Sequence, residues 1–203
     1  TNLIADCDIE IQAYRPAVVY INGEYWGIHN IREKINEHFV ASNSDSNANE
    51  IDILEGNAAI VQGDNQHYGE MMYFVEHFDM SNMSYYENVA SKMDIENYIT
   101  YQAAQIFFNN TDWPGNNIKY WRPQTPTGKW RWILYDTDFG FGIWNVYDYM
   151  NNTLVFATDD SGPGWPNPPW ATLLFRRLLY NESFQTDFIN RFCDILNTNF
   201  LPV

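Results

Sequence analysis

The stretch "NNTDWPGNNIKYWR" (residues 109–122) separates an apolar, helix-like segment from two strand-like segments. Pro114 disfavours helical geometry at Trp113, and Gly115 leaves the backbone free to turn. The helix before this stretch is therefore predicted to end at about residue 110. Asp112 and Asn117 then belong to the loop that follows the helix.

The segment before this loop, "DIENYITYQAAQIFFNN" (94–110), is the clearest predicted helix. Its apolar residues recur at helical spacing, as Ile95, Tyr98, Ile99, Ala103 and Ile106. Asp94 is placed to cap the first turn, and Glu96 puts negative charge where a helix start favours it.

Two predicted strands follow the loop, "IKYWR" (118–122) and "KWRWILYD" (129–136), on either side of the turn-rich "PQTPTG". The second strand runs into "DTDFGFG" (136–142). Asp136 therefore ends a strand, and Asp138 follows it. One hairpin would bring this strand end to the loop that carries Asp112.

A second hairpin is predicted upstream, over "RPAVVYINGEYWGIHNIRE" (15–33). Asn22-Gly23 is the strongest short turn signal, and apolar runs flank it on both sides.

The remaining patterns predict mostly helices, so the fold class is α+β with a small β component. Helices are expected at 33–41, 66–78, 84–93, 169–181 and 182–200, with a polar loop at 42–50, an irregular excursion at 51–65 and a long loop at 143–168.

The charge balance excludes some classes of partner. The formal net charge of -15 opposes nucleic acid and anionic membrane surfaces, which bind through cationic side chains. It permits divalent cations and basic partners. Aromatic residues make up 17% of the chain, mostly as expected core. No apolar run is long enough to span a bilayer.

The two cysteines and the first residue carry less information. Cys7 and Cys193 match no metal-binding spacing; one disulfide and two buried free thiols both fit the sequence. The chain opens at Thr1 without a methionine, which predicts a trimmed or processed piece.

The two loops carry residue types that suit phosphoryl transfer. Asp112 can accept the proton of an acceptor hydroxyl, and Asn117 follows at the D-x-x-x-x-N spacing of a kinase catalytic loop. Asp136, or Asp138 of the literal "DFG", can hold a metal, because Mg²⁺ prefers oxygen ligands. Taken singly, each of these residues more often shapes a turn.

Three motifs together resemble the CotH family of spore-coat-type atypical protein kinases. They are "VVYINGEYWGIHNIREKINEHFV", "NNTDWPGNNIKYWR" and "WRWILYDTDFGFG". The resemblance implies a divergent kinase-like fold and transfer of the ATP γ-phosphoryl group to Ser or Thr of proteins, with Mg²⁺ or Mn²⁺. It implies Asp112 as the catalytic aspartate and Asn117 and Asp136 as metal ligands, with Asp138 assisting. Coat or cell-surface association is also implied.

The chain departs from the family pattern at its start. The family has a segment before the hairpin that includes small-lobe strands and a phosphate-contacting lysine, and the first 14 residues are too few to supply it. Arg32 or Lys34 would have to take the part of that lysine, the alternative being exposed charges beside a helix end, and Glu33 is expected to orient the nucleotide or to accept at a helix start. Residues 1–203 are therefore expected to form one domain truncated at its N-terminus: the helical catalytic lobe with a β-hairpin remnant of the small lobe.

Two other function classes fit parts of the sequence. A catalytically inactive, kinase-like surface interaction or carbohydrate-associated module would suit the aromatic, acidic composition. A glycosyltransferase would use Asp136 and Asp138 as a metal-binding Asp-x-Asp, but it leaves Asp112 and Asn117 without a role. The sequence predicts no oligomeric state.

Overall fold

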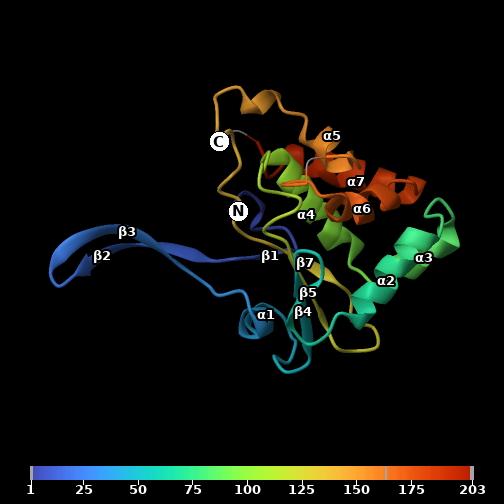
Figure 1. The fold of residues 1–203 in the computed structure, drawn as a ribbon, viewed down its shortest axis with the longest axis horizontal. Helices are drawn as coiled ribbons and strands as arrows, with labels where there is room; N and C mark the ends of the chain where they lie inside the picture. Colours follow the sequence, from blue (N-terminus) through green and yellow to red (C-terminus); the bar gives the residue numbers. More distant parts are fainter. Residues whose placement is uncertain (1, 163, 202–203) are drawn as a thin grey trace.

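Helices and two separate sheets make up the chain, which is an α+β protein as predicted (Figure 1). The computed structural model describes residues 2–162 and 164–201. The strands are β1 (Glu10–Ile11), β2 (Tyr14–Ile21), β3 (Glu24–Arg32), β4 (Ile51–Glu55), β5 (Ala59–Gln62), β6 (Lys119–Pro123) and β7 (Arg131–Leu134). The α-helices are α1 (Glu37–Asn43), α2 (Gln66–His77), α3 (Met83–Ala90), α4 (Ile95–Phe107), α5 (Thr153–Thr158), α6 (Pro169–Leu178) and α7 (Glu182–Leu196).

The larger sheet has the strand order β1-β7-β6-β4-β5. β6 pairs antiparallel with both β4 and β7, and the short β1 pairs parallel with β7. Among residues 2–162 and 164–201, the strands do not alternate with helices as in a Rossmann-like nucleotide domain. The glycosyltransferase interpretation therefore gains no support from the topology.

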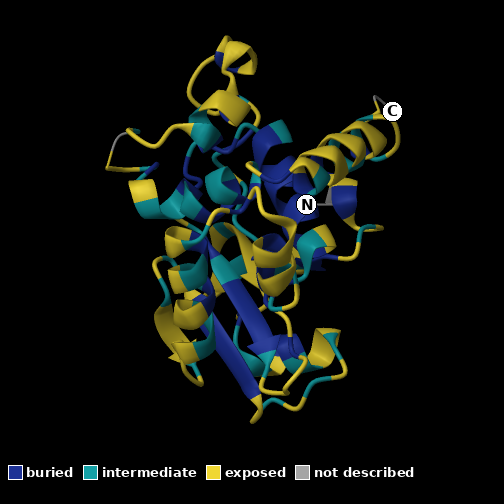
Figure 2. Ribbon diagram, turned by 90° about the vertical axis from the view of Figure 1, so that its right-hand side faces the viewer, coloured by how far each residue is buried: buried dark blue, intermediate teal, exposed yellow. Residues whose placement is uncertain are grey.

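Helix α4 packs its apolar side against one face of this sheet. The Asp94 side chain accepts a hydrogen bond of 3.1 Å from the backbone N–H of Asn97, so the predicted N-cap is confirmed. One core cluster joins α4, the sheet and the C-terminal helices, including Tyr98, Ala103, Tyr120, Trp132, Leu134, Phe175 and Phe184. Figure 2 shows the buried strands between exposed outer segments.

The opposite face of the sheet is covered by α1. Phe39 and Val40 of α1 form a second core cluster with sheet residues that include Ile53, Trp121 and Ile133. The helix begins at Glu37, later than the predicted residue 33, because the Asn36 side chain caps it by accepting from the N–H of Phe39.

The prediction of an irregular excursion over 51–65 is wrong. β4 occupies the interior of the sheet, with Ile51, Ile53 and Leu54 fully buried, and β5 follows. The strand has no apolar–polar alternation because both of its faces are covered. The buried acidic residue of this strand, Asp52, lies 3.2 Å from the Arg122 guanidinium on β6.

The predicted upstream hairpin is confirmed as β2 and β3, which form a two-stranded arm that extends away from the body (Figure 1). Asn22 and Gly23 both have positive φ, as a tight hairpin turn requires. The arm exposes large apolar side chains, among them Val18, Tyr20, Tyr25, Trp26 and Ile28.

The remaining predicted helices are present with shifted ends, and the predicted loop at 143–168 contains the short helix α5 and one turn of 3₁₀ helix at Asp148–Met150. Cys7 and Cys193 are both free thiols, but neither is buried as that alternative expected: Cys7 is half-buried and Cys193 is exposed. In the part of the chain that is described, no helix combines the length and hydrophobicity of a membrane span.

Candidate active site

Asp112 lies in the loop after α4, as predicted, and is 6% exposed. Its Oδ2 atom accepts two hydrogen bonds from side-chain amides: one of 2.8 Å from Asn116 and one of 2.7 Å from Asn117. Asn117 has a φ of 53°, in the left-handed region that asparagine tolerates. Sequence reasoning missed Asn116, although its position beside Asn117 in an amide-rich loop was the available signal.

A buried polar chain fixes the start of this loop. Asn110 donates 2.8 Å to the Gln105 Oε1 atom, and Gln105 donates 3.3 Å to the Tyr101 hydroxyl. The Asn110 Oδ1 atom in turn accepts from the backbone N–H of Asp112 at 3.2 Å. Helix α4 therefore holds the backbone of Asp112 through side chains on its last turns.

The loop after α4 is hydrogen-bonded to the loop after β7. The Phe139 carbonyl accepts from both the backbone N–H and the hydroxyl of Thr111, at 3.1 and 3.0 Å. The Phe141 N–H donates 2.7 Å to the Phe108 carbonyl, and the Trp144 indole donates 2.9 Å to the Thr111 hydroxyl. The hairpin β6–β7 thus brings the two predicted loops together.

Asp136 lies two residues after β7, which pairs with β6 as predicted, and has a φ of 51°. Its Oδ1 atom accepts a hydrogen bond of 3.0 Å from Arg32, at the end of the arm. Arg32 and Asp136 are 104 residues apart in sequence, so this ion pair belongs to the tertiary structure alone.

Tyr135 links the two acidic positions electrostatically. Burial raises the pKa of its phenol most, and the neighbouring Tyr101, Glu55, Asp136 and Asp112 raise that pKa further, in that order. A negative charge at Asp112 or at Asp136 therefore raises the pKa of the same phenol group.

The predicted site residues divide between two neighbouring places. A hollow of about 280 Å³ is lined by Arg32, Asp136 and the exposed Asp138, together with Gln12, Tyr14, Asn30, Tyr135 and Thr137. Asp112 and Asn117 lie in the adjoining loop and do not line that hollow. Among the described residues, no three His, Cys, Asp or Glu side chains converge to hold a metal.

Glu33 has a structural contact. Its carboxylate accepts a hydrogen bond of 3.0 Å from the backbone N–H of Ala13, and its own N–H donates 3.1 Å to the Ala13 carbonyl. Glu33 therefore joins the two strands at the base of the arm. It is not the acceptor at the start of α1, because the Asn36 side chain caps that helix.

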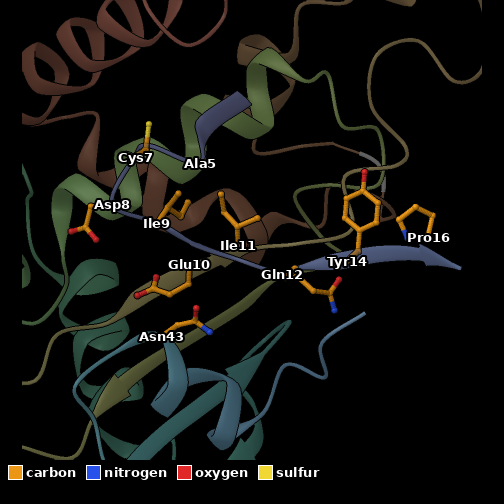
Figure 3. Close-up of a pocket in the computed structure, with 11 residues that line it drawn as sticks. Ala5, Cys7, Asp8, Ile9, Glu10, Ile11, Gln12, Tyr14, Pro16 and Asn43 are labelled. Atoms are coloured by element: carbon orange, nitrogen blue, oxygen red, sulfur yellow. The ribbon is translucent and has the colours of Figure 1, made fainter. Parts of the chain in front are cut away.

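Three hollows of the described structure are larger than the hollow of Asp136; one of about 420 Å³ borders Thr111, and the other two lie away from Asp112. One of about 560 Å³ runs along β1, lined by the N-terminal segment and by Asn43 of α1 (Figure 3). Another, of about 860 Å³, lies between α4, α7 and the segment 141–154. Neither is lined by Asp112, so size alone does not mark the candidate active site.

Comparison with known proteins agrees with the resemblance drawn from the motifs. The sequence pattern of the family described as CotH kinase protein matches residues 1–202, nearly the whole chain. No curated protein is similar enough to count as a match. With the motif residues Asp112, Asn117 and Asp136 placed on joined loops, the chain belongs to the CotH kinase protein family.

Proposed function

We propose that this chain is a protein kinase of divergent kinase-like fold, which transfers the γ-phosphoryl group of ATP to Ser or Thr of a protein substrate. The proposal treats residues 1–203 as one domain. The observation that carries it is the junction between Thr111 and Phe139, which joins the loop of Asp112 to the loop of Asp136 and Asp138.

Asp112 is the general base in this proposal. Asn116 and Asn117 hold its Oδ2 atom, while its Oδ1 atom accepts no hydrogen bond from the described residues. That oxygen is available to receive the proton of an acceptor hydroxyl. The two amides fix the orientation of the carboxylate, which reduces the rearrangement needed before transfer.

Asn117, Asp136 and Asp138 would hold Mg²⁺ or Mn²⁺. Their donor atoms suit a hard cation: Asn117 bonds Asp112 through its nitrogen and keeps its amide oxygen, and Asp136 bonds Arg32 through one carboxylate oxygen. The ion would supply positive charge that neutralises the triphosphate. Because no three acidic or imidazole side chains converge in the described structure, phosphate oxygens and water would complete the coordination.

Arg32 and Glu33 have different parts at the nucleotide. Arg32 borders the hollow of Asp136 and Asp138, so its guanidinium is placed to approach phosphate oxygens. Glu33 contributes by fixing the strand that carries Arg32, through Ala13. Both assignments depend on placing the phosphate groups of the nucleotide in this hollow.

The test is transfer of labelled phosphate from ATP, measured as autophosphorylation and on a Ser/Thr peptide library. Asp112→Asn keeps the shape of the side chain but cannot accept the proton, so transfer should fall by about 10²–10⁴-fold. Asp45→Asn, at an exposed loop position, is the matched control and should retain full transfer. Equal transfer by Asp112→Asn and wild type would reject Asp112 as the base.

A second candidate function is a catalytically inactive interaction or carbohydrate-associated module, favoured by the apolar residues exposed on the β2–β3 arm. Thermal unfolding distinguishes the two, because a ligand stabilises the fold that binds it. ATP with Mg²⁺ should raise the melting temperature of a kinase and leave that of an interaction module unchanged.

A further inference from the structure

A charged pair and a tyrosine lie at one end of the larger sheet, beside the core cluster that α1 forms with it. On the face where α1 packs, Ile53, Trp121 and Ile133 are buried beneath the helix. At the end of the same strands lie Lys119 of β6, Glu55 of β4 and Tyr135 after β7. The Lys119 ammonium is 3.1 Å from the Glu55 carboxylate and 5.3 Å from the centre of the Tyr135 ring.

Lys119 and Tyr135 are close in sequence to residues of the candidate active site, and Tyr135 lines the hollow of Asp136. Lys119 follows Asn117 by two residues, and Tyr135 precedes Asp136. Lys119 is opposite Ile133 in the β6–β7 register, and alternate residues of a strand share a face. The ammonium group therefore lies on the sheet face next to the two loops that carry the proposed metal ligands.

Two other cations of these strands have more acidic partners or are more deeply buried than Lys119. Arg131 is bonded to Asp8, Glu10 and Asp94. Arg122 is buried against Asp52. Lys119 has one acidic partner, Glu55. The Glu55 side chain is 50% exposed, so water competes with Lys119 for its carboxylate.

A triphosphate needs positive charge at this position. The chain has a net charge of -15, and Asp112, Asp136 and Asp138 add three acidic groups at the proposed site. Bringing phosphate close to them is unfavourable unless cations balance the charge. Arg32 faces one of these carboxylates, Asp136, so a divalent ion and a side-chain cation in addition to Arg32 would balance the remaining charge.

We propose that Lys119 exchanges its contact with Glu55 for the phosphate groups of the bound nucleotide, so that β6 supplies a second phosphate-contacting cation beside Arg32. The inference rests on the proposed function. The Lys119 ammonium group lies over the Tyr135 ring, and Glu55 holds that group in place while no nucleotide is bound.

Calorimetry of the full chain with ATP, ADP and adenosine, each with Mg²⁺, tests the proposal. Lys119→Met removes the charge and keeps the stem. It should weaken ATP and ADP by about tenfold or more, the effect of losing one charged hydrogen bond, and leave adenosine unchanged. Lys119→Arg should restore most of the affinity. Lys129→Met, an exposed lysine in the β6–β7 connection, is the control and should bind all three like wild type.

The outcomes separate the two proposals. Wild-type ATP binding that Lys119→Met leaves unchanged overturns the role of Lys119 and leaves the kinase assignment standing. An equal loss of affinity for ATP and for adenosine also overturns this role, because the lysine would then act on nucleoside binding or on folding. Melting temperatures measured without ligand identify an effect on folding. Failure of the wild-type chain to bind ATP overturns both.

Discussion

The side-chain amide of Asn117 donates a 2.7 Å hydrogen bond to Asp112, so the five-residue spacing in the sequence is a direct contact in the fold. Asn116 donates to the same carboxylate oxygen at 2.8 Å. The two amides therefore have one contact in common, the one that holds Asp112, and the proposed function gives Asn117 alone a second part, as a metal ligand through its amide oxygen. This difference makes their contributions separable.

Asn116→Ala should lower the transfer rate by about tenfold or more while the KM for ATP stays unchanged. The variant loses one amide–carboxylate hydrogen bond that orients Asp112, and no contact with nucleotide. Steady-state kinetics with varied ATP measures both constants. Asn117→Ala is the comparison and should lower the rate and weaken metal-dependent ATP binding together. An unaltered rate in Asn116→Ala would show that Asn117 alone positions the base.

Asn110→Ala should destabilise the fold by about 1–3 kcal/mol, because it leaves the buried Gln105 oxygen and the Asp112 N–H without their partner. Urea unfolding followed by circular dichroism measures the change. Asn190→Ala, on the exposed side of α7, is the control and should change stability little. Equal stability of the two variants would mean that water replaces the buried contacts.

Acid should destabilise the protein through His67. Burial lowers the pKa of this imidazole, with the nearby Arg122 and Lys92 acting in the same direction. Its Nδ1 atom accepts a hydrogen bond of 3.0 Å from the Trp130 indole when the ring is neutral. The folded state thus binds fewer protons than the unfolded state, so this contribution is complete above about pH 6.5 and is lost as the pH falls through the lowered value.

His67→Gln removes the titration and keeps an acceptor for the indole. Its free energy of unfolding should change less than that of wild type between pH 7 and pH 5, about the range in which histidine titrates. His38→Gln, at an exposed position of α1, should keep the wild-type slope. A wild-type slope in His67→Gln would contradict the assignment.

Asp136→Asn should abolish the gain in Mg²⁺ or Mn²⁺ affinity that ATP produces. Magnesium relies on a few carboxylates together with phosphate oxygens, so metal binding without nucleotide should be weak in wild type. Calorimetry with and without ATP measures this coupling. Asp160→Asn, an exposed aspartate near α6, is the control for nonspecific attraction by the acidic chain. Unchanged coupling in Asp136→Asn would reject Asp136 as a metal ligand.

Local signals in the sequence determined several elements correctly. The Asn22-Gly23 turn, the Asp94 cap of α4 and the end of that helix near Pro114 all depend on residues close in sequence. Turn geometry, capping and helical periodicity act over a few residues, so they can be read without the fold. The order of Asp112, Asn117 and Asp136 along the chain is determined in the same way.

Contacts between distant segments were decided only by the tertiary structure. β4 was missed although it pairs locally with β5, because no alternation marks a strand covered on both faces, and its other partner, β6, is distant in sequence. The Arg32–Asp136 pair, and the approach of Glu55 to Lys119, likewise join segments far apart in sequence. The sequence by itself determined which residues stand at the ends of helices and strands. Packing of the sheet decided which of those ends meet, because distant contacts depend on the burial of whole surfaces.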